Sequence, residues 1–112
     1  MKSRNKDSPI IYICSPYSGN VQHNIEMACR YSRFAVDEGY VPITPHLWLP
    51  LFLSEEIERE LAIGIDLRLM DVCTELWVCG DLISDGMRRE MSYAADLGIP
   101  IQHVKEEDLC TQ

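Results

Sequence analysis

Short apolar runs alternate along the chain with longer segments in which apolar residues recur every three or four positions. The short runs are rich in branched residues and end at loop residues, which is typical of strands buried on both faces of a parallel sheet. They predict strands at residues 9–14, 40–44, 75–80 and 99–104. Pro42 lies inside the second run, so an edge position or an irregularity is expected there.

The longer segments predict three helices. The first begins near Val21 and ends before Gly39, because glycine suits the position that follows a helix end. The third extends from Ser84, a preferred N-cap residue, to the stop signal formed by Gly98 and Pro100.

The second helix is expected to be capped by Ser54 and to reach Cys73, with a bend near Gly64. Its predicted inward face contains Ile57, Leu61 and Ile65 in the first half and Leu69, Met70 and Cys73 in the second. Residues 45–53 are apolar but interrupted by two prolines, which favours a loop that covers another part of the molecule.

Strands that alternate with helices predict an α/β fold: a three-layer, Rossmann-like (flavodoxin-like) sandwich around a mostly parallel sheet of four to five strands. Residues 9–104 are expected to form a single domain, with a flexible N-terminal tail at 1–8 and a C-terminal tail at 105–112. In such folds ligands bind beyond the carboxyl ends of the strands, so the loops at 15–20, 45–50 and 80–86 are expected to form the binding site.

The composition limits the partners. The 112 residues suffice for one domain, and 18 acidic against 10 basic residues give a formal net charge of −8. Such a surface repels polyanions, which excludes duplex nucleic acid and anionic membranes as expected partners. A small anion is still a possible ligand, because backbone N–H groups at a helix N-terminus can bind it.

The apolar runs are shorter than a membrane span, and the polar N-terminus lacks the apolar core of a signal peptide, so a cytoplasmic protein is expected. The five cysteines have no CxxC spacing and are interpreted as reduced structural thiols: Cys14, Cys29, Cys73, Cys79 and Cys110. The histidines, His23, His46 and His103, have no metal-ligand spacing to one another or to the cysteines. No metal and no cofactor are expected.

Glu90 is the unusual residue of the third helix. At about 100° per residue it falls between Ala94 and Leu97, on the flank that faces the protein and near the carboxyl edge of the third strand. Carboxylates in such partly desolvated positions are often functional. The alternative, which spacing alone favours, is a boundary residue whose head reaches water or pairs with an arginine.

Asp66 flanks the apolar stripe of the second helix, beside Met70 and Cys73. The alternative for Asp66 is a salt bridge with Arg59 or Arg68. Two carboxylates, one attacking a sugar carbon and one handling the proton of the leaving group, are what retaining cleavage of a glycosidic bond requires. The sequence is compatible with such a pair.

Several loop residues are candidate ligand contacts. Ser84 and Gly86 leave free N–H groups that suit a phosphate or a sugar hydroxyl, although plain N-capping is the alternative and Asp85 would compete with an anion. The first loop offers Ser15, Ser18 and Gly19, while Tyr12 and Tyr17 are placed to orient a base or a sugar. Without a GxGxxG motif, capping of the first helix is an equal alternative for this loop. His46 is expected to line a base pocket, and Trp48 to pack as part of a lid.

Three segments carry a family resemblance: "IYICSPYSG", "IDLRLMDVCTELWVCG" and "ISDGMRREMSYAADLGIPI". Between Ile10 and Ile101 the chain resembles the nucleoside 2-deoxyribosyltransferase-like superfamily, and most closely its small bacterial and phage members of the DUF4406 type. The resemblance implies that Glu90 attacks the anomeric carbon and that Asp66 assists proton transfer and sugar binding. It also implies that Ser84 and Gly86 hold the sugar or its 5′-phosphate and that Tyr12 is a site tyrosine.

The implied activity is N-glycosidic cleavage of a nucleoside or nucleotide, or deoxyribosyl transfer, through a covalent glutamyl–sugar intermediate. Two departures leave the substrate open: Ser18 replaces an arginine of the monophosphate hydrolases, and Thr74 replaces a frequent acidic residue. The alternatives are a nucleotide-binding module without turnover and a glycohydrolase of NAD-type dinucleotides. The resemblance further implies a homodimer or higher homo-oligomer, for which the apolar residues 46–53 are the candidate contact.

Overall fold

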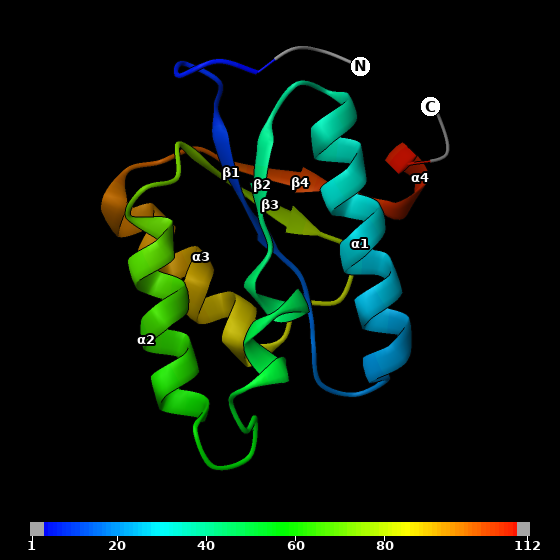
Figure 1. Ribbon diagram of the computed structural model, residues 1–112, viewed down its shortest axis with the longest axis vertical. Coiled ribbons are helices and arrows are strands. Elements are labelled where there is room, and N and C mark those ends of the chain that lie inside the picture. Colours follow the sequence, from blue (N-terminus) through cyan, green and yellow to red (C-terminus); the bar gives the residue numbers. More distant parts are fainter. Residues whose placement is uncertain (1–3, 110–112) are drawn as a thin grey trace.

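The computed structural model describes residues 4–109; predictions for residues 1–3 and 110–112, which include the tail ends and Cys110, lie outside this range. A parallel four-stranded sheet forms the middle layer, in the order β2-β1-β3-β4 (Figure 1). The strands are β1 Ile10–Cys14, β2 Val41–Ile43, β3 Glu75–Cys79 and β4 Ile101–Val104. The predicted α/β sandwich is confirmed, and β2, which contains Pro42, is an edge strand as expected.

Successive strand residues point to opposite faces of the sheet, as their 2-residue period requires. On β1, Tyr12 and Cys14 pack with residues of α2 (Arg59–Met70) and α3 (Asp85–Leu97). Ile11 and Ile13 pack on the other face with residues of α1 (Val21–Asp37). Figure 1 shows α1 on the side of the sheet opposite α2 and α3. The short helix α4 (Glu106–Leu109), which lies in the predicted C-terminal tail, adds Leu109 to this second cluster.

The predicted helix ends at α3 are confirmed. The Ser84 hydroxyl accepts a hydrogen bond from the Met87 N–H at 3.2 Å, and Gly98 ends the helix with a left-handed φ of 78°. These two residues determine where α3 starts and stops, and the helix buries Met87, Glu90 and Ala94. Within residues 4–109 no helix has the length and apolar content needed to cross a membrane.

The predicted inward face of α2 was wrong in its first half. The helix starts at Arg59, after a turn in which the Ser54 hydroxyl accepts from the Ile57 N–H at 3.3 Å. Ile57 is 86% exposed and Leu61 53% exposed. The buried residues are Ala62, Ile63, Asp66 and Met70, about one position further along the helix, and α2 continues through Gly64 without interruption.

This rotation has a physical reason. The cluster of apolar residues in α2 suggested a stripe through Leu61, but the helix instead turns small Ala62 and acidic Asp66 toward the interior.

The predicted loop at residues 45–53 forms two 3-10 turns, η1 Pro45–Leu47 and η2 Leu49–Leu51. Pro45 is the first residue of η1 and Pro50 the second residue of η2, positions at which the missing N–H costs no hydrogen bond within the turn.

Candidate active site

A cleft of about 570 Å³, its open mouth included, lies beyond the carboxyl ends of β1 and β3. Its walls come from the loop after β1, the η1 and η2 turns, α2 and the start of α3, segments that lie together at the lower end of the sheet in Figure 1. This is the place predicted from the order of strands and helices.

Eight of the ten predicted site residues line the cleft: Ser15, Tyr17, Ser18, His46, Asp66, Ser84, Gly86 and Glu90. Tyr12 lies behind the lining and touches Glu90. Gly19 lies outside the lining, exposed, with a φ of 95° that suits the turn leading into α1.

Glu90 is 2% exposed, which confirms the inward orientation expected from the helical wheel. The Tyr12 hydroxyl donates a hydrogen bond to Glu90 Oε2, while Glu90 Oε1 has no hydrogen-bond partner among the described residues. The alternative of a boundary residue that reaches water or an arginine is therefore wrong. Since an unsatisfied buried acceptor is costly, an oxygen left free at a cleft wall points to a ligand.

Asp66 is 4% exposed, and its Oδ1 also lacks a partner within the described part of the chain. The predicted alternative, a salt bridge with Arg68, is wrong because Arg68 pairs with Asp71 at 3.4 Å. Ligand oxygens of Asp66 and Glu90 lie within 4.8 Å of each other. Helices α2 and α3 thus bring two buried carboxyl groups together, as the sequence allowed but did not require.

The environment of the pair favours its protonated state. Burial, followed by the neighbouring charge of Asp66, raises the pKa of Glu90, and burial raises the pKa of Asp66. Because each ionisation opposes the other, the two groups titrate as a unit and hold a proton to a higher pH than isolated carboxyl groups. Burial also raises the pKa of Tyr12, so its phenol remains a hydrogen-bond donor.

His46 approaches the carboxyl pair from η1. Its partly exposed ring stacks against Tyr17, with ring centroids 6.3 Å apart, and burial lowers the pKa of the imidazole to about 4. The ring is therefore neutral at neutral pH. One ligand atom of His46 lies within 4.8 Å of those of Asp66 and Glu90, a meeting that the spacing along the sequence did not indicate.

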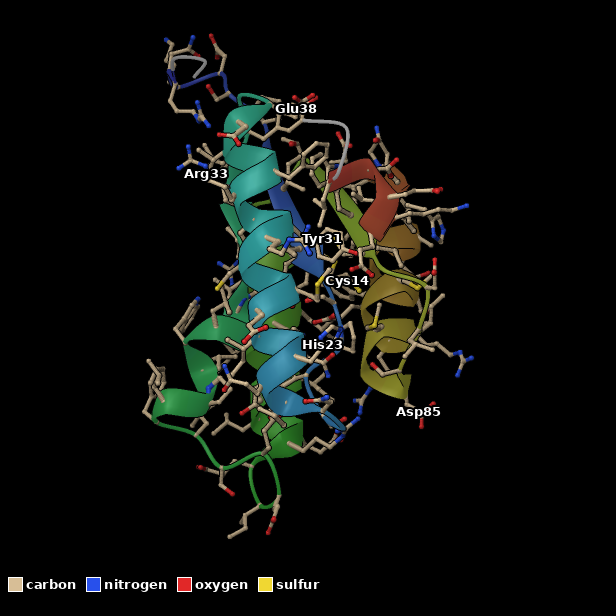
Figure 2. All side chains as sticks on the ribbon, turned by 90° about the vertical axis from the view of Figure 1, so that its right-hand side faces the viewer. Cys14, His23, Tyr31, Arg33, Glu38 and Asp85 are labelled. Carbon is tan, nitrogen blue, oxygen red and sulfur yellow. The ribbon has the colours of Figure 1, made fainter. Side chains whose placement is uncertain are left out.

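The start of α3 forms the opposite end of the cleft. A methyl group on Gly86 would meet Arg59 Nη2 at 3.7 Å and Ser84 Oγ at 3.9 Å, so the Arg59 guanidinium lies over this helix N-terminus. Figure 2 shows Asp85 pointing away from the body of the protein, and its side chain is 89% exposed and paired with Arg88. The Asp85 carboxylate, although it belongs to the first residue of α3, therefore points to solvent and pairs with Arg88.

The sequence interpretation missed seven lining residues: Leu49, Pro50, Glu55, Arg59, Ala62, Ile63 and Met87. Arg59 was considered only as a partner of Asp66. Its position seven residues before Asp66, two helical turns, places both on one face of α2 and was the available signal. No ion pair within 4.0 Å joins the Arg59 guanidinium to a carboxylate in residues 4–109.

Ser18 and Thr74, the two residues that differ from the pattern of the family that the sequence resembles, lie in different parts of the structure. Ser18 is exposed at the cleft rim. Thr74 lies at the opposite, amino end of the strands, where its hydroxyl exchanges hydrogen bonds of 3.1 Å with the Ile10 N–H and carbonyl. Thr74 therefore joins β1 to the start of β3 and does not contact the cleft.

Comparison with known proteins gives one family and a shared fold. The family model described as Domain of unknown function (DUF7768) matches residues 9–104, while no curated protein matches. The expected closer likeness to the DUF4406 type stays a prediction, because the matching family model is DUF7768.

Two solved structures are similar. A 2-deoxyribosyltransferase from the psychrotolerant bacterium Bacillus psychrosaccharolyticus matches with a TM-score of 0.66 and 23% identity, over 86% of this chain and 72% of that one. A 2-desoxiribosyltransferase from Leishmania mexicana gives a TM-score of 0.67 and 15% identity, over 87% of this chain and 64% of its own length. At these identities the likeness shows the fold alone.

The carboxyl pair makes a prediction for stability. Because folding raises the pKa of Glu90 above its ordinary value of 4.5, its contribution to stability is favourable below that value and is lost as pH rises through the folded pKa. Glu90→Gln removes this effect. From about pH 5 to about pH 8 the variant should gain on the order of 2 kcal/mol relative to wild type, measured by urea denaturation at each pH.

Glu60→Gln is the matched control, since Glu60 is on the surface, paired with Arg89 at 2.9 Å, and the pKa of its carboxyl is lowered by that arginine. It should show no such gain at high pH. Equal pH dependence for wild type and Glu90→Gln would contradict the burial of an ionisable pair.

Proposed function

Because the chain belongs to the family described as a domain of unknown function (DUF7768), we propose its activity from the cleft: cleavage of the N-glycosidic bond of a nucleoside or nucleotide. The sugar forms a covalent ester with Glu90 and then passes to water or to a second base. The fold shared with 2-deoxyribosyltransferases supports this proposal. The observation that carries it is the buried carboxyl pair with one free oxygen on each group.

The separation of the pair supports the covalent route. Retaining glycosidases place their carboxyl groups about 5 Å apart, whereas inverting enzymes leave roughly 6.5–9.5 Å for a water molecule. Ligand oxygens of Glu90 and Asp66 lie within 4.8 Å of each other. The short separation favours direct attack by a carboxylate over attack by an intervening water.

In the first step Glu90 Oε1 attacks the anomeric carbon while the bond from that carbon to the base nitrogen breaks. The base leaves with the bonding electrons, and Asp66 supplies the proton that neutralises it. This step requires the proton of the pair to reside on Asp66 when the substrate is bound, and the hydrogen bond from Tyr12 to Glu90 Oε2 supports that state because it favours the ionised form of Glu90.

In the second step a water molecule or the nitrogen of another base attacks the same carbon from the opposite face. Asp66, now ionised, accepts the proton that the incoming group loses. The ester bond breaks, its electrons return to Glu90, and the two inversions together retain the configuration at the anomeric carbon.

Arg59 supports a substrate that carries a 5′-phosphate. Among residues 4–109 no carboxylate pairs with the Arg59 guanidinium, which lies over the partial positive charge of a helix N-terminus. An anion bound there relieves the repulsion between these two positive charges. The hydroxyl of Ser84 and the close approach allowed by Gly86 lie beside it. The monophosphate hydrolases carry an arginine in the first loop, where this chain has Ser18. We propose that Arg59 on α2 supplies the corresponding positive charge.

The exposed apolar residues near the cleft support self-association. They are Trp48 (39% exposed), Leu51 (81%), Phe52 (65%), Ile57 (86%) and Leu61 (53%), all between η1 and the first turn of α2. Their location on one continuous segment beside the cleft mouth is typical of an interface rather than of scattered surface residues. We propose that a second copy of the chain covers this surface.

The first test is release of free base. Wild type, incubated with a panel of ribo- and deoxyribonucleosides, their 5′-monophosphates and NAD, should release base from at least one member, detected by chromatography. Glu90→Gln should abolish release, because the amide cannot attack the sugar carbon. The surface variant Glu60→Gln should retain full activity.

Absence of base from every member with wild type would refute the enzymatic proposal. Thermal stabilisation by a nucleotide without any product would then identify a binding module, and nicotinamide release confined to NAD would identify a dinucleotide glycohydrolase.

The second test concerns Arg59. Arg59→Ala should raise KM for the nucleoside monophosphate roughly 10- to 100-fold, the value of a charge-assisted hydrogen bond, and leave KM for the corresponding nucleoside unchanged. Arg88→Ala is the matched control, since Arg88 pairs with exposed Asp85 and does not line the cleft. Equal effects of Arg59→Ala on both substrates would contradict phosphate recognition.

The third test concerns the apolar surface. Phe52→Glu should convert an oligomer of the wild type into a monomer, as measured by light scattering after size-exclusion chromatography, because a charge placed in an apolar interface is not solvated. Val72→Glu, which changes a 54% exposed residue after the other end of α2, should leave the mass unchanged. A wild-type chain that is monomeric at all concentrations would refute the proposed interface.

A further inference from the structure

Three side chains from three different elements meet at one wall of the cleft. His46 comes from η1, Asp66 from α2 and Glu90 from α3, and one ligand atom of each lies within 4.8 Å of the other two. The oxygens Asp66 Oδ1 and Glu90 Oε1 are buried without a hydrogen-bond partner among the described residues. This set therefore offers one histidine nitrogen together with two carboxylate oxygens that residues 4–109 leave unsatisfied.

The charges of this wall favour a cation. Two carboxyl groups face each other, and Glu55 adds a third acidic side chain to the same cleft, whereas the positive charge of Arg59 lies beside Gly86 at the start of α3. The neutral ring of His46 supplies a lone pair rather than a competing positive charge. Tyr12 donates to the second oxygen of Glu90 and so holds that carboxylate in place, as the supporting partners of metal ligands do.

We propose that His46, Asp66 and Glu90 bind one divalent first-row transition ion of the Zn²⁺ class, with a fourth position open to the cleft. A set of one imidazole and two carboxylates suits such an ion, whereas Mg²⁺ and Ca²⁺ prefer six or more oxygen ligands. A tetrahedral ion with bonds of about 2.0–2.2 Å places its ligands roughly 3.5 Å apart, so atoms that lie within 4.8 Å of one another need to close by little more than about 1 Å at most. We assign that movement to His46, whose ring is partly exposed and lies on a short 3-10 turn.

The ion would occupy Glu90 Oε1, the oxygen to which we assign attack on the sugar. Metal binding and turnover are then mutually exclusive, and Zn²⁺ acts as an inhibitor that competes with the substrate. This consequence rests on the proposed function, whereas metal binding itself does not.

The direct test is titration of the metal-free protein with Zn²⁺ by calorimetry, without substrate. Wild type should bind one ion per chain, and His46→Ala should weaken binding by at least the roughly 10- to 100-fold that loss of a supporting partner costs. His103→Ala, an exposed histidine on β4, and Cys29→Ser, an exposed thiol, are the matched controls and should bind as wild type does. Circular dichroism checks that each variant is folded, and His46→Gln replaces His46→Ala should the latter fail to fold.

Bound Co²⁺ adds a spectroscopic readout. Its absorption should show nitrogen and oxygen ligation without the sulfur-to-cobalt charge-transfer band that a cysteine ligand gives. No stoichiometric binding, binding that survives loss of His46, or binding lost with Cys29→Ser would overturn the proposed site. Base release by wild type that Zn²⁺ does not inhibit would refute the competition alone, and Zn²⁺ binding by a protein that releases no base would leave the metal site standing while the proposed function fails.

Discussion

The burial of two carboxyl groups beside each other is the constraint on which the other features depend. Each group loses its hydration, and each opposes ionisation of the other, so the pair lowers the free energy of unfolding at neutral pH. The surrounding fold must outweigh this cost. It does so with a sheet whose central strands are buried on both faces, with Tyr12 and Leu76 on one side and Ile11 and Trp77 on the other.

The same constraint explains the rotation of α2. A helix oriented by hydrophobicity alone would bury Leu61, yet Asp66 reaches Glu90 only when Ala62 and Asp66 face inward. Apolar side chains are consequently left on the surface next to the cleft mouth. One orientation of α2 thus both buries Asp66 beside Glu90 and leaves apolar residues at the rim of the cleft. Proteins commonly give up some stability in this way where an active site requires it.

The fold was predictable because its signals are local. The apolar runs indicated each strand, and Ser84 and Gly98 marked the ends of α3, from which the inward direction of Glu90 followed by helical geometry. The orientation of α2 was not predictable, because its apolar residues occupy more than one face and their spacing alone does not select one of them. The sequence also did not predict that His46 lies near the carboxyl pair or that Arg59 lies near Gly86, because contacts between separate elements leave no periodic pattern in the sequence.

Tyr12 is part of the packed core and also contacts Glu90, which lines the cleft. It is fully buried on the central strand β1, paired in register with Ile43 on one side and Leu76 on the other, and its hydroxyl ends on Glu90. Because strand side chains alternate between faces, a slip of β1 by one residue would place isoleucine under the glutamate and leave both of its oxygens without a donor. The alignment of backbone hydrogen bonds in the sheet is therefore itself a determinant of the acid–base state of the cleft, and sequence drift in the core of this protein is limited by chemistry as well as by packing.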